Sequence, residues 1–163
     1  MVEAAIQSLP LERFACKIAV VSDAQTAAFC GKAGFSIVYN PSPKSGQGLT
    51  ITLGMQAAQA VDAMLFCVAD QPYLQKSSVI RLLDHYSPGS MYALSHQGKR
   101  GNPVLFPSAL FAALRALKPT QTGRFVIQQH MEKLVLVEAA SAKELQDIDT
   151  KEALEDLSNI KKA

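Results

Sequence analysis

Residues 63–72 read Ala63-Met64-Leu65-Phe66-Cys67-Val68-Ala69-Asp70-Gln71-Pro72. Seven apolar residues, 63–69, run without interruption and end at an acid that is followed two positions later by a proline. A short apolar run bounded by turn-forming residues is typical of a buried strand, and seven residues are too few to span a bilayer. Residues 64–68 are therefore predicted to form a strand at the centre of a sheet.

Short apolar runs alternate with amphipathic stretches on both sides of this strand. Further strands are predicted over residues 17–21, 35–39, 91–95, 103–106 and 134–138, with a short extended piece at 145–148. Helices are predicted over residues 2–9, 23–32, 49–60, 77–86, 108–117, 122–130 and 150–160. Residues 96–102 are expected to form a loop. The alternation predicts an α/β fold, with one mostly parallel sheet covered by helices on both faces. Ligands of such folds bind beyond the carboxyl ends of the strands.

Composition narrows the class of protein. The chain has 163 residues, the size of one domain, and 48% of them are hydrophobic, which excludes disorder as the main state. The net charge of +2 argues against a dedicated nucleic-acid binder. The chain opens without a signal-peptide pattern. Its three cysteines, Cys16, Cys30 and Cys67, form no C-x-x-C pair and are expected to be buried, reduced thiols in a cytoplasmic protein.

Basic residues dominate the middle of the chain. Between positions 71 and 130 there are seven Lys or Arg residues and one acid, Asp84. This excess suits an anionic ligand such as a phosphate, but on charge alone a solvated basic face without a ligand is the favoured explanation. Lys99, Arg100 and Arg124 are candidate phosphate contacts within it.

Asp70 lies at the predicted carboxyl end of the strand at 64–68. A carboxylate in that position is costly unless it caps a helix, pairs with a cation or binds a metal. An ordinary turn aspartate in an Asp-x-Pro sequence is the alternative.

A loop rich in turn formers, residues 40–48, precedes a predicted helix and includes Gly46 and Gly48. Backbone N–H groups at a helix N-terminus can hold an anion, and Thr50 and Thr52 could add hydrogen bonds. A flexible connector is the alternative, because the segment matches neither a Walker loop nor a Rossmann fingerprint.

Asp147 and Asp149 point to the same face of an extended segment, an arrangement that suits a hard cation such as magnesium. The spacing of Asp149 and Glu152 also matches a capping box, so Asp149 alternatively starts the last helix.

Taken in order, four segments resemble the MobA-like nucleotidyltransferases, most closely the branch of the molybdenum cofactor cytidylyltransferases and guanylyltransferases. They are Asn40 with the Gly-Leu-Thr-Ile-Thr-Leu-Gly sequence of 48–54, Leu-Phe-Cys-Val-Ala-Asp-Gln-Pro at 65–72, Gly-Asn-Pro-Val-Leu-Phe at 101–106, and Asp-Ile-Asp-Thr at 147–150. The resemblance covers nearly the whole chain. It implies a single domain with a three-layer α/β/α sandwich, like that of the nucleotide-diphospho-sugar transferases.

The resemblance also implies an activity and a site. Family members transfer CMP or GMP from CTP or GTP to molybdopterin, with magnesium on the triphosphate. It implies that Asp70 is catalytic and a magnesium ligand, with Asp147 or Asp149 as the second acidic contact. Nucleotide-binding positions would be Asn40, Gly48, Thr50 and Thr52, and acceptor-side positions Gly101, Asn102, Pro103 and Arg124. The nearest carboxylates of Asp70 and Asp147 or Asp149 are expected about 4–8 Å apart, a span that one magnesium with a bridging water covers.

Two departures from the family pattern are visible. The glycine-rich segment L-A-A-G-x-S-x-R-M-G has no counterpart, and residues 2–9 resemble the helix that follows it; the Gly-x-Arg segment at 120–124 also lacks the family's acid. We therefore expect the first strand and the triphosphate loop to be missing, leaving an apolar flank open beside residues 18–21 and 64–68. Poor solubility, a homodimer through that edge, or inertness toward nucleotide would follow.

Two other functions stay open. One is a non-catalytic relative that binds a partner such as a molybdoenzyme. The other is a sugar-nucleotide or isoprenoid nucleotidyltransferase.

Overall fold

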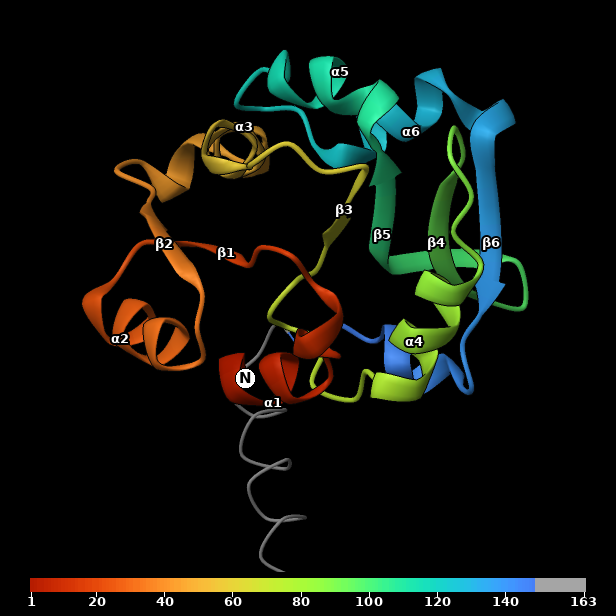
Figure 1. The fold of residues 1–163 in the computed structure, drawn as a ribbon, viewed down its shortest axis with the longest axis horizontal. Helices are drawn as coiled ribbons and strands as arrows, with labels where there is room; N and C mark the ends of the chain where they lie inside the picture. The colour runs from red at the N-terminus through yellow and green to blue at the C-terminus, as the bar shows by residue number, and fades with distance from the viewer. Residues whose placement is uncertain (149–163) are drawn as a thin grey trace, which may run out of the picture.

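The computed structural model describes residues 1–148, so the predictions that concern Asp149 and the helix at 150–160 lie outside the described residues. Strands form a middle layer between two layers of helices (Figure 1). One layer contains α1 (Val2–Gln7), α2 (Ala24–Lys32) and α4 (Lys76–Asp84), and the other contains α3 (Gln47–Ala57), α5 (Phe111–Arg115) and α6 (Gly123–Gln129). The predicted α/β/α class is confirmed. No helix within residues 1–148 is long and apolar enough to cross a membrane.

Short 3-10 helices connect several of these elements: η1 (Leu11–Arg13), η2 (Pro43–Ser45), η3 (Ser108–Leu110), η4 (Met131–Lys133) and η5 (Ala142–Leu145). The expected extended piece at 145–148 is thus preceded by a 3-10 turn that ends at Leu145.

Four strands form the larger sheet, in the order β3 (Ala63–Phe66), β5 (Lys99–Pro107), β4 (Met91–His96) and β6 (Leu134–Glu138). β5 is antiparallel to both of its neighbours, whereas β4 and β6 are parallel. The antiparallel pair arises because a two-residue turn joins β4 to β5: Gln97 and Gly98 have φ of 50° and 76°, as in type I′ hairpin turns. The loop expected over 96–102 is therefore wrong, since β5 already begins at Lys99.

The smaller sheet contains β1 (Ile18–Val21) and β2 (Ser36–Tyr39), paired in parallel through the crossover helix α2. Asp23 begins α2 as predicted, because its carboxylate accepts a hydrogen bond from the Thr26 N–H at 2.8 Å.

The two sheets are not hydrogen-bonded to each other in the described chain, and a cavity of about 870 Å³ lies between β1 and β3. The predictions of a single sheet and of a central position for 64–68 are therefore wrong: among the residues that the structure describes, β3 pairs with β5 alone and is an edge strand. An apolar run indicates that a strand has apolar surroundings. It does not say whether those surroundings are neighbouring strands, as predicted, or the wall of a cavity, as here. The expected open flank beside residues 18–21 and 64–68 is confirmed.

The core consists of two clusters on opposite faces of the larger sheet. Met91 and Ala93 of β4 pack on the side of α3, α5 and α6, while Tyr92 and Leu94 pack on the side of α4. Phe66 and Phe106 meet edge to face across β3 and β5, with ring centroids 5.4 Å apart. These contacts fix the position of β3 on one side only.

Candidate functional site

The end of β3 lies against the last described residues of the chain. The Ile148 N–H donates to the Asp70 carbonyl at 2.8 Å, and the Gln71 Nε2 donates to Asp147 Oδ1, also at 2.8 Å. Gln71 is only 2% exposed, and its amide also reaches the Leu145 carbonyl at 3.4 Å. The structure thus brings together Asp70 and Asp147, which are 77 positions apart in the sequence.

Glu144 is a buried acid that holds together the segments around Asp70 and Asp147. It is 1% exposed, and its carboxylate accepts hydrogen bonds from the backbone N–H groups of Ala140 (2.8 Å), Ser141 (3.2 Å) and Gln75 (3.1 Å). Gln75 is the residue before α4, so one buried acid connects the turn after Asp70 to the segment that carries Asp147. Three charge-assisted hydrogen bonds offset the cost of burying this carboxylate.

The oxygen donors at this corner suit a magnesium ion that enters with the substrate better than a metal held by protein side chains alone. Within residues 1–148, no group of three or more His, Cys, Asp or Glu side chains is arranged to hold a metal ion. Magnesium is usually held by one or two carboxylates, with water and substrate phosphates completing its shell. Asp70 and Asp147 are a donor set of that kind, and the expected separation of their carboxylates stays a prediction.

The loop at 40–48 holds one contact between two of the predicted nucleotide-binding residues. Asn40 is 6% exposed, and its Nδ2 donates to Thr50 Oγ1 at 3.0 Å, so two of the predicted nucleotide-binding residues touch. Asn40 also orders the loop, because its Oδ1 accepts the Ser42 N–H at 2.9 Å. Thr50 lines the cavity between the sheets.

Gly48 and Thr52, which were expected to bind the nucleotide, instead form hydrogen bonds within the protein. The Gly48 N–H donates to the Pro119 carbonyl at 3.1 Å, so it is not free for a phosphate, and a Cβ there would lie 2.0 Å from the Lys118 carbonyl oxygen. Gly48 is therefore required for the close approach of α3 to the segment at 118–121. The Thr52 hydroxyl donates back to the Leu49 carbonyl at 3.0 Å within the same helix, and Thr52 is not part of the cavity wall.

Two arginines that line the cavity lie close to each other, and Arg13 and Lys17 line it as well. Arg100 is half-buried and Arg124 is exposed, and both line the cavity with Asn102. Burial and, secondarily, the nearby Arg124 guanidinium lower the pKa of Arg100. Neither arginine forms an ion pair with an acid of residues 1–148. The pair of Arg100 and Arg124 is thus suited to an anionic group in the cavity.

Gly101 and Pro103, two of the predicted acceptor-side residues, contact only the protein core and its neighbouring segments. A Cβ on Gly101 would lie 2.9 Å from Leu145 Cδ2, so the glycine admits η5, and Pro103 is fully buried. Neither residue lines the cavity, and neither do Asp70 and Asp147, although Ala69 does. The acidic corner therefore lies beside the cavity and not within it.

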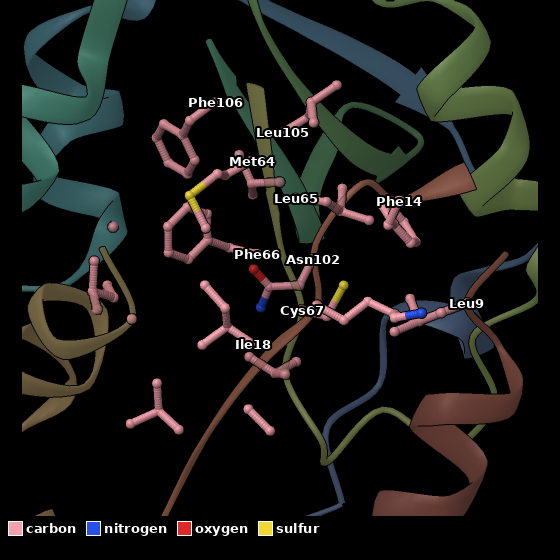
Figure 2. Close-up of a pocket in the computed structure, with 18 of the residues that line it drawn as sticks. Leu9, Phe14, Ile18, Met64, Leu65, Phe66, Cys67, Asn102, Leu105 and Phe106 are labelled. Carbon is pink, nitrogen blue, oxygen red and sulfur yellow. The ribbon is translucent and has the colours of Figure 1, made fainter. Parts of the chain in front are cut away.

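All three cysteines are free, but only Cys30 is buried: Cys16 is half-buried and Cys67 is exposed, so the expectation that all three are buried is wrong. Cys67 follows β3 and faces the cavity (Figure 2). The surrounding apolar walls raise the pKa of its thiol to about 12, so it is protonated at neutral pH.

Sequence reasoning singled out Asp70, Asp147, Asn40, Thr50 and Arg124, but it assigned no role to Gln71 or Glu144. Gln71 lies inside the apolar-run motif, and Ser141 with Glu144 has the spacing of a capping box, which was a usable signal.

Comparison with known proteins places this geometry in a family. The family described as "MobA-like NTP transferase domain" matches residues 1–134 of this chain. Nicotine blue oxidoreductase of Paenarthrobacter nicotinovorans is 26% identical over 149 residues, 85% of this chain and 73% of that protein.

Two solved structures share the fold. A nucleotidyl transferase from Methanothermobacter has a TM-score of 0.73 at 17% identity, over 98% of this chain and 79% of the other. A Mycobacterium tuberculosis protein, solved in complex with manganese, has a TM-score of 0.71 at 15% identity, over 96% and 84%. The family match covers most of the chain, which therefore belongs to the MobA-like NTP transferase domain family.

Proposed function

We propose that the chain transfers CMP or GMP from CTP or GTP to a phosphate of a molybdopterin-type cofactor. Family membership supports nucleotidyl transfer in general, and the choice of nucleotide and acceptor follows from the motif resemblance. The observation that carries the proposal is the corner in which Gln71 joins the end of β3 to Asp147. Asp149 is proposed as a further acid at this corner, in the part of the chain beyond residue 148.

The reaction needs charge neutralisation and alignment more than covalent help. An acceptor phosphate oxygen forms a bond to the α-phosphorus of the nucleotide, and the bond from that phosphorus to the bridging oxygen breaks, so pyrophosphate leaves. Magnesium, when bound with the triphosphate, neutralises its charge. A similar structure solved with manganese supports a divalent ion in this fold.

The residues have separate roles in this scheme. Asp70 and Asp147 would hold the metal, and Gln71 and Glu144 are positioning residues because they act through Asp147 and its segment. Thr50 forms part of the nucleotide wall, and Asn40 holds the Thr50 hydroxyl from behind that wall. Arg100 and Arg124, which line the cavity, bind an anionic group of the acceptor.

The test is Asp70→Asn, assayed by pyrophosphate release with magnesium, CTP or GTP, and molybdopterin. Loss of partners that merely support a ligand costs 10–100-fold, so loss of the ligand is expected to lower the rate by at least about 100-fold. Asp84→Asn is the matched control, because Asp84 lies at an exposed ion pair with Arg13 away from this corner and should keep full activity.

Calorimetric titration of the unaltered chain with magnesium-CTP and magnesium-GTP complements this assay. Binding of one of them supports the proposal. Absence of binding by either would overturn it and favour the accessory role in which the chain binds a molybdoenzyme.

A redox reaction is the second candidate, favoured by the relative named nicotine blue oxidoreductase. A spectrophotometric assay with nicotine blue and a reduced or oxidised nicotinamide nucleotide separates the two. Turnover of the dye without pyrophosphate release from any nucleotide would select the redox function.

A further inference from the structure

Lys143 and Tyr73 form a pair beside the acidic corner that has no role in the scheme above. The Lys143 ammonium lies over the Tyr73 ring, with its Nζ 4.2 Å from the ring centroid. We propose that this lysine binds the phosphate groups that magnesium brings to Asp70 and Asp147, and that Tyr73 is a positioning residue that holds the ammonium there. The inference rests on the proposed nucleotidyl transfer, because it needs the same metal and the same phosphates at this corner.

The pair belongs to the contact between the two segments that build the corner. Residues 70–75 follow β3, and residues 143–148 are the last that the structure describes. Hydrogen bonds of the Gln71 side chain and of the Gln75 N–H join the first segment to the second, one on each side of Tyr73 in the sequence. Figure 1 shows the second segment, in blue, beside the start of α4. The ring and the ammonium therefore lie on a part of the corner that is held firmly in place.

Among residues 1–148, the charge of Lys143 has no carboxylate partner. The side chain is exposed and forms no ion pair with an acid of this part of the chain. The acids closest to it in the sequence have other partners: Glu144 accepts three backbone N–H groups, and Asp147 accepts the Gln71 amide. An aromatic ring attracts a cation without neutralising it, and the ammonium keeps N–H donors for a ligand. Lys143 is thus available to an anionic group.

The basic side chains of the adjoining helix α4 are already engaged. Lys76 pairs with Glu12 at 3.4 Å, and Arg81 donates a hydrogen bond to the Glu138 carbonyl at 2.6 Å. Neither contact involves the corner. Lys143 is therefore a better candidate than either of them for a phosphate at the two acids.

The position of Lys143 also separates its ligand from the anion of the acceptor. Arg100 and Arg124 line the cavity, whereas Lys143, Tyr73 and the two acids do not. The lysine thus shares with the acids the region outside the cavity wall, where the metal and its phosphates would bind. We assign the arginines to the acceptor and Lys143 to the phosphates of the nucleotide.

This assignment gives the lysine a defined chemical role. Its ammonium donates an N–H to a phosphate oxygen, and a hydrogen bond of this kind is strengthened by the opposite charges. Negative charge grows on the pyrophosphate as its bond to the α-phosphorus breaks, and a cation already in place stabilises that charge. Lys143 therefore contributes both to binding of the triphosphate and to departure of the pyrophosphate.

The probe for this role is inorganic pyrophosphate with magnesium, which carries phosphates but no base, sugar or acceptor. Calorimetric titration of the full chain should detect its binding, and Lys143→Gln should weaken the binding by at least about tenfold, because a charge-assisted hydrogen bond is lost. Lys143→Arg should stay within about threefold of the unaltered chain, since a guanidinium also stacks on rings and binds phosphate. Lys32→Gln is the matched control: it removes an exposed lysine at the end of α2 and should leave the affinity unchanged.

Tyr73 has its own pair of variants. Tyr73→Phe keeps a ring beneath the ammonium and should keep the affinity for magnesium pyrophosphate. Tyr73→Leu removes the ring and should weaken binding by about two- to fivefold, the effect of losing an exposed cation–π contact. Thermal unfolding verifies that both variants are folded. A ring that only stabilises the fold would lower the melting temperature of Tyr73→Leu without changing its affinity, which would contradict the positioning role.

Two results would overturn the inference: equal affinity of the unaltered chain and Lys143→Gln for magnesium pyrophosphate, or no binding by the unaltered chain. Titration of the same proteins with magnesium-CTP and magnesium-GTP distinguishes this inference from the proposed function. Nucleotide binding that Lys143→Gln leaves unchanged would remove the lysine from the site and leave nucleotidyl transfer intact. Pyrophosphate binding that depends on Lys143, with no binding of either nucleotide, would overturn nucleotidyl transfer and support the lysine as a phosphate ligand.

Discussion

β3 and β4 are similar in composition and lie in the same sheet, yet only one of them is buried. β4 pairs with β5 and β6, and its residues Met91 to Leu94 are at most 5% exposed. Within residues 1–148 β3 pairs with β5 alone, and all four residues of β3 are half-buried. The comparison shows that the burial of an apolar strand depends on its neighbours, so an apolar strand with one open edge marks a surface that can still bind something.

The largest expected effect comes from truncating one leucine in each strand. Leu94 of β4 is fully buried, so Leu94→Ala removes its packing and leaves a cavity, at a cost of about 3 kcal/mol in the free energy of unfolding. Leu65 of β3 is half-buried in the same cluster, and Leu65→Ala should cost about 1 to 2 kcal/mol. Urea denaturation of the two variants measures both values. Equal costs would break the comparison, because they would mean that β3 is as well packed as β4.

A second, smaller effect on stability tests how tightly α3 packs against the segment at 118–121. The Cβ of Gly48→Ala would meet the carbonyl oxygens of Lys118 and Gln121, at 2.0 and 2.8 Å, so backbone must move, and we expect a loss of about 2 kcal/mol. Gly31 in α2 has nothing within 4 Å of its Cβ position, and Gly31→Ala should gain about 0.5 to 1 kcal/mol from lower unfolded-state entropy. Thermal unfolding of the pair checks the opposite signs, and a neutral Gly48→Ala would show that α3 is loosely held.

The elements that sequence reasoning located well depend on local signals. The helix predicted over 23–32 is confirmed as α2, with Asp23 as its N-cap, and β1 and β2 follow from short apolar runs next to it. The β4–β5 hairpin was missed because its turn places Gln97 at positive φ, which glutamine gives no reason to expect. The open edge of β3 could be expected only from the family resemblance, because the apolar run by itself predicted a central strand.

In the candidate site, too, some features could be predicted from the sequence and others could not. The approach of Asp70 to Asp147 followed from the order of family-like motifs, and the structure supports it through Gln71. The bonds from Gln71 to Asp147 and from Gln75 to Glu144 join residues 76 and 69 positions apart, so no local pattern could show them. The local capping-box spacing of Ser141 and Glu144 could have marked Glu144 as a structural acid, but not its bond to Gln75. Gly48 was assigned to anion binding because glycine before a helix permits it, but what the structure requires there is space for a neighbouring backbone.

The central claim is that the sheet is interrupted between β1 and β3, and native-state hydrogen exchange of the free chain tests it most directly. Amides of β4 and β5, which have hydrogen-bonded neighbours on both sides, should exchange only through global unfolding. Amides of β1 and the cavity-facing amides of β3 should exchange at least about 100-fold faster, because water reaches the edge without unfolding the larger sheet. Equal protection of β1, β3 and β4 in a monomeric free chain would contradict the account, since it would mean that the two sheets are joined.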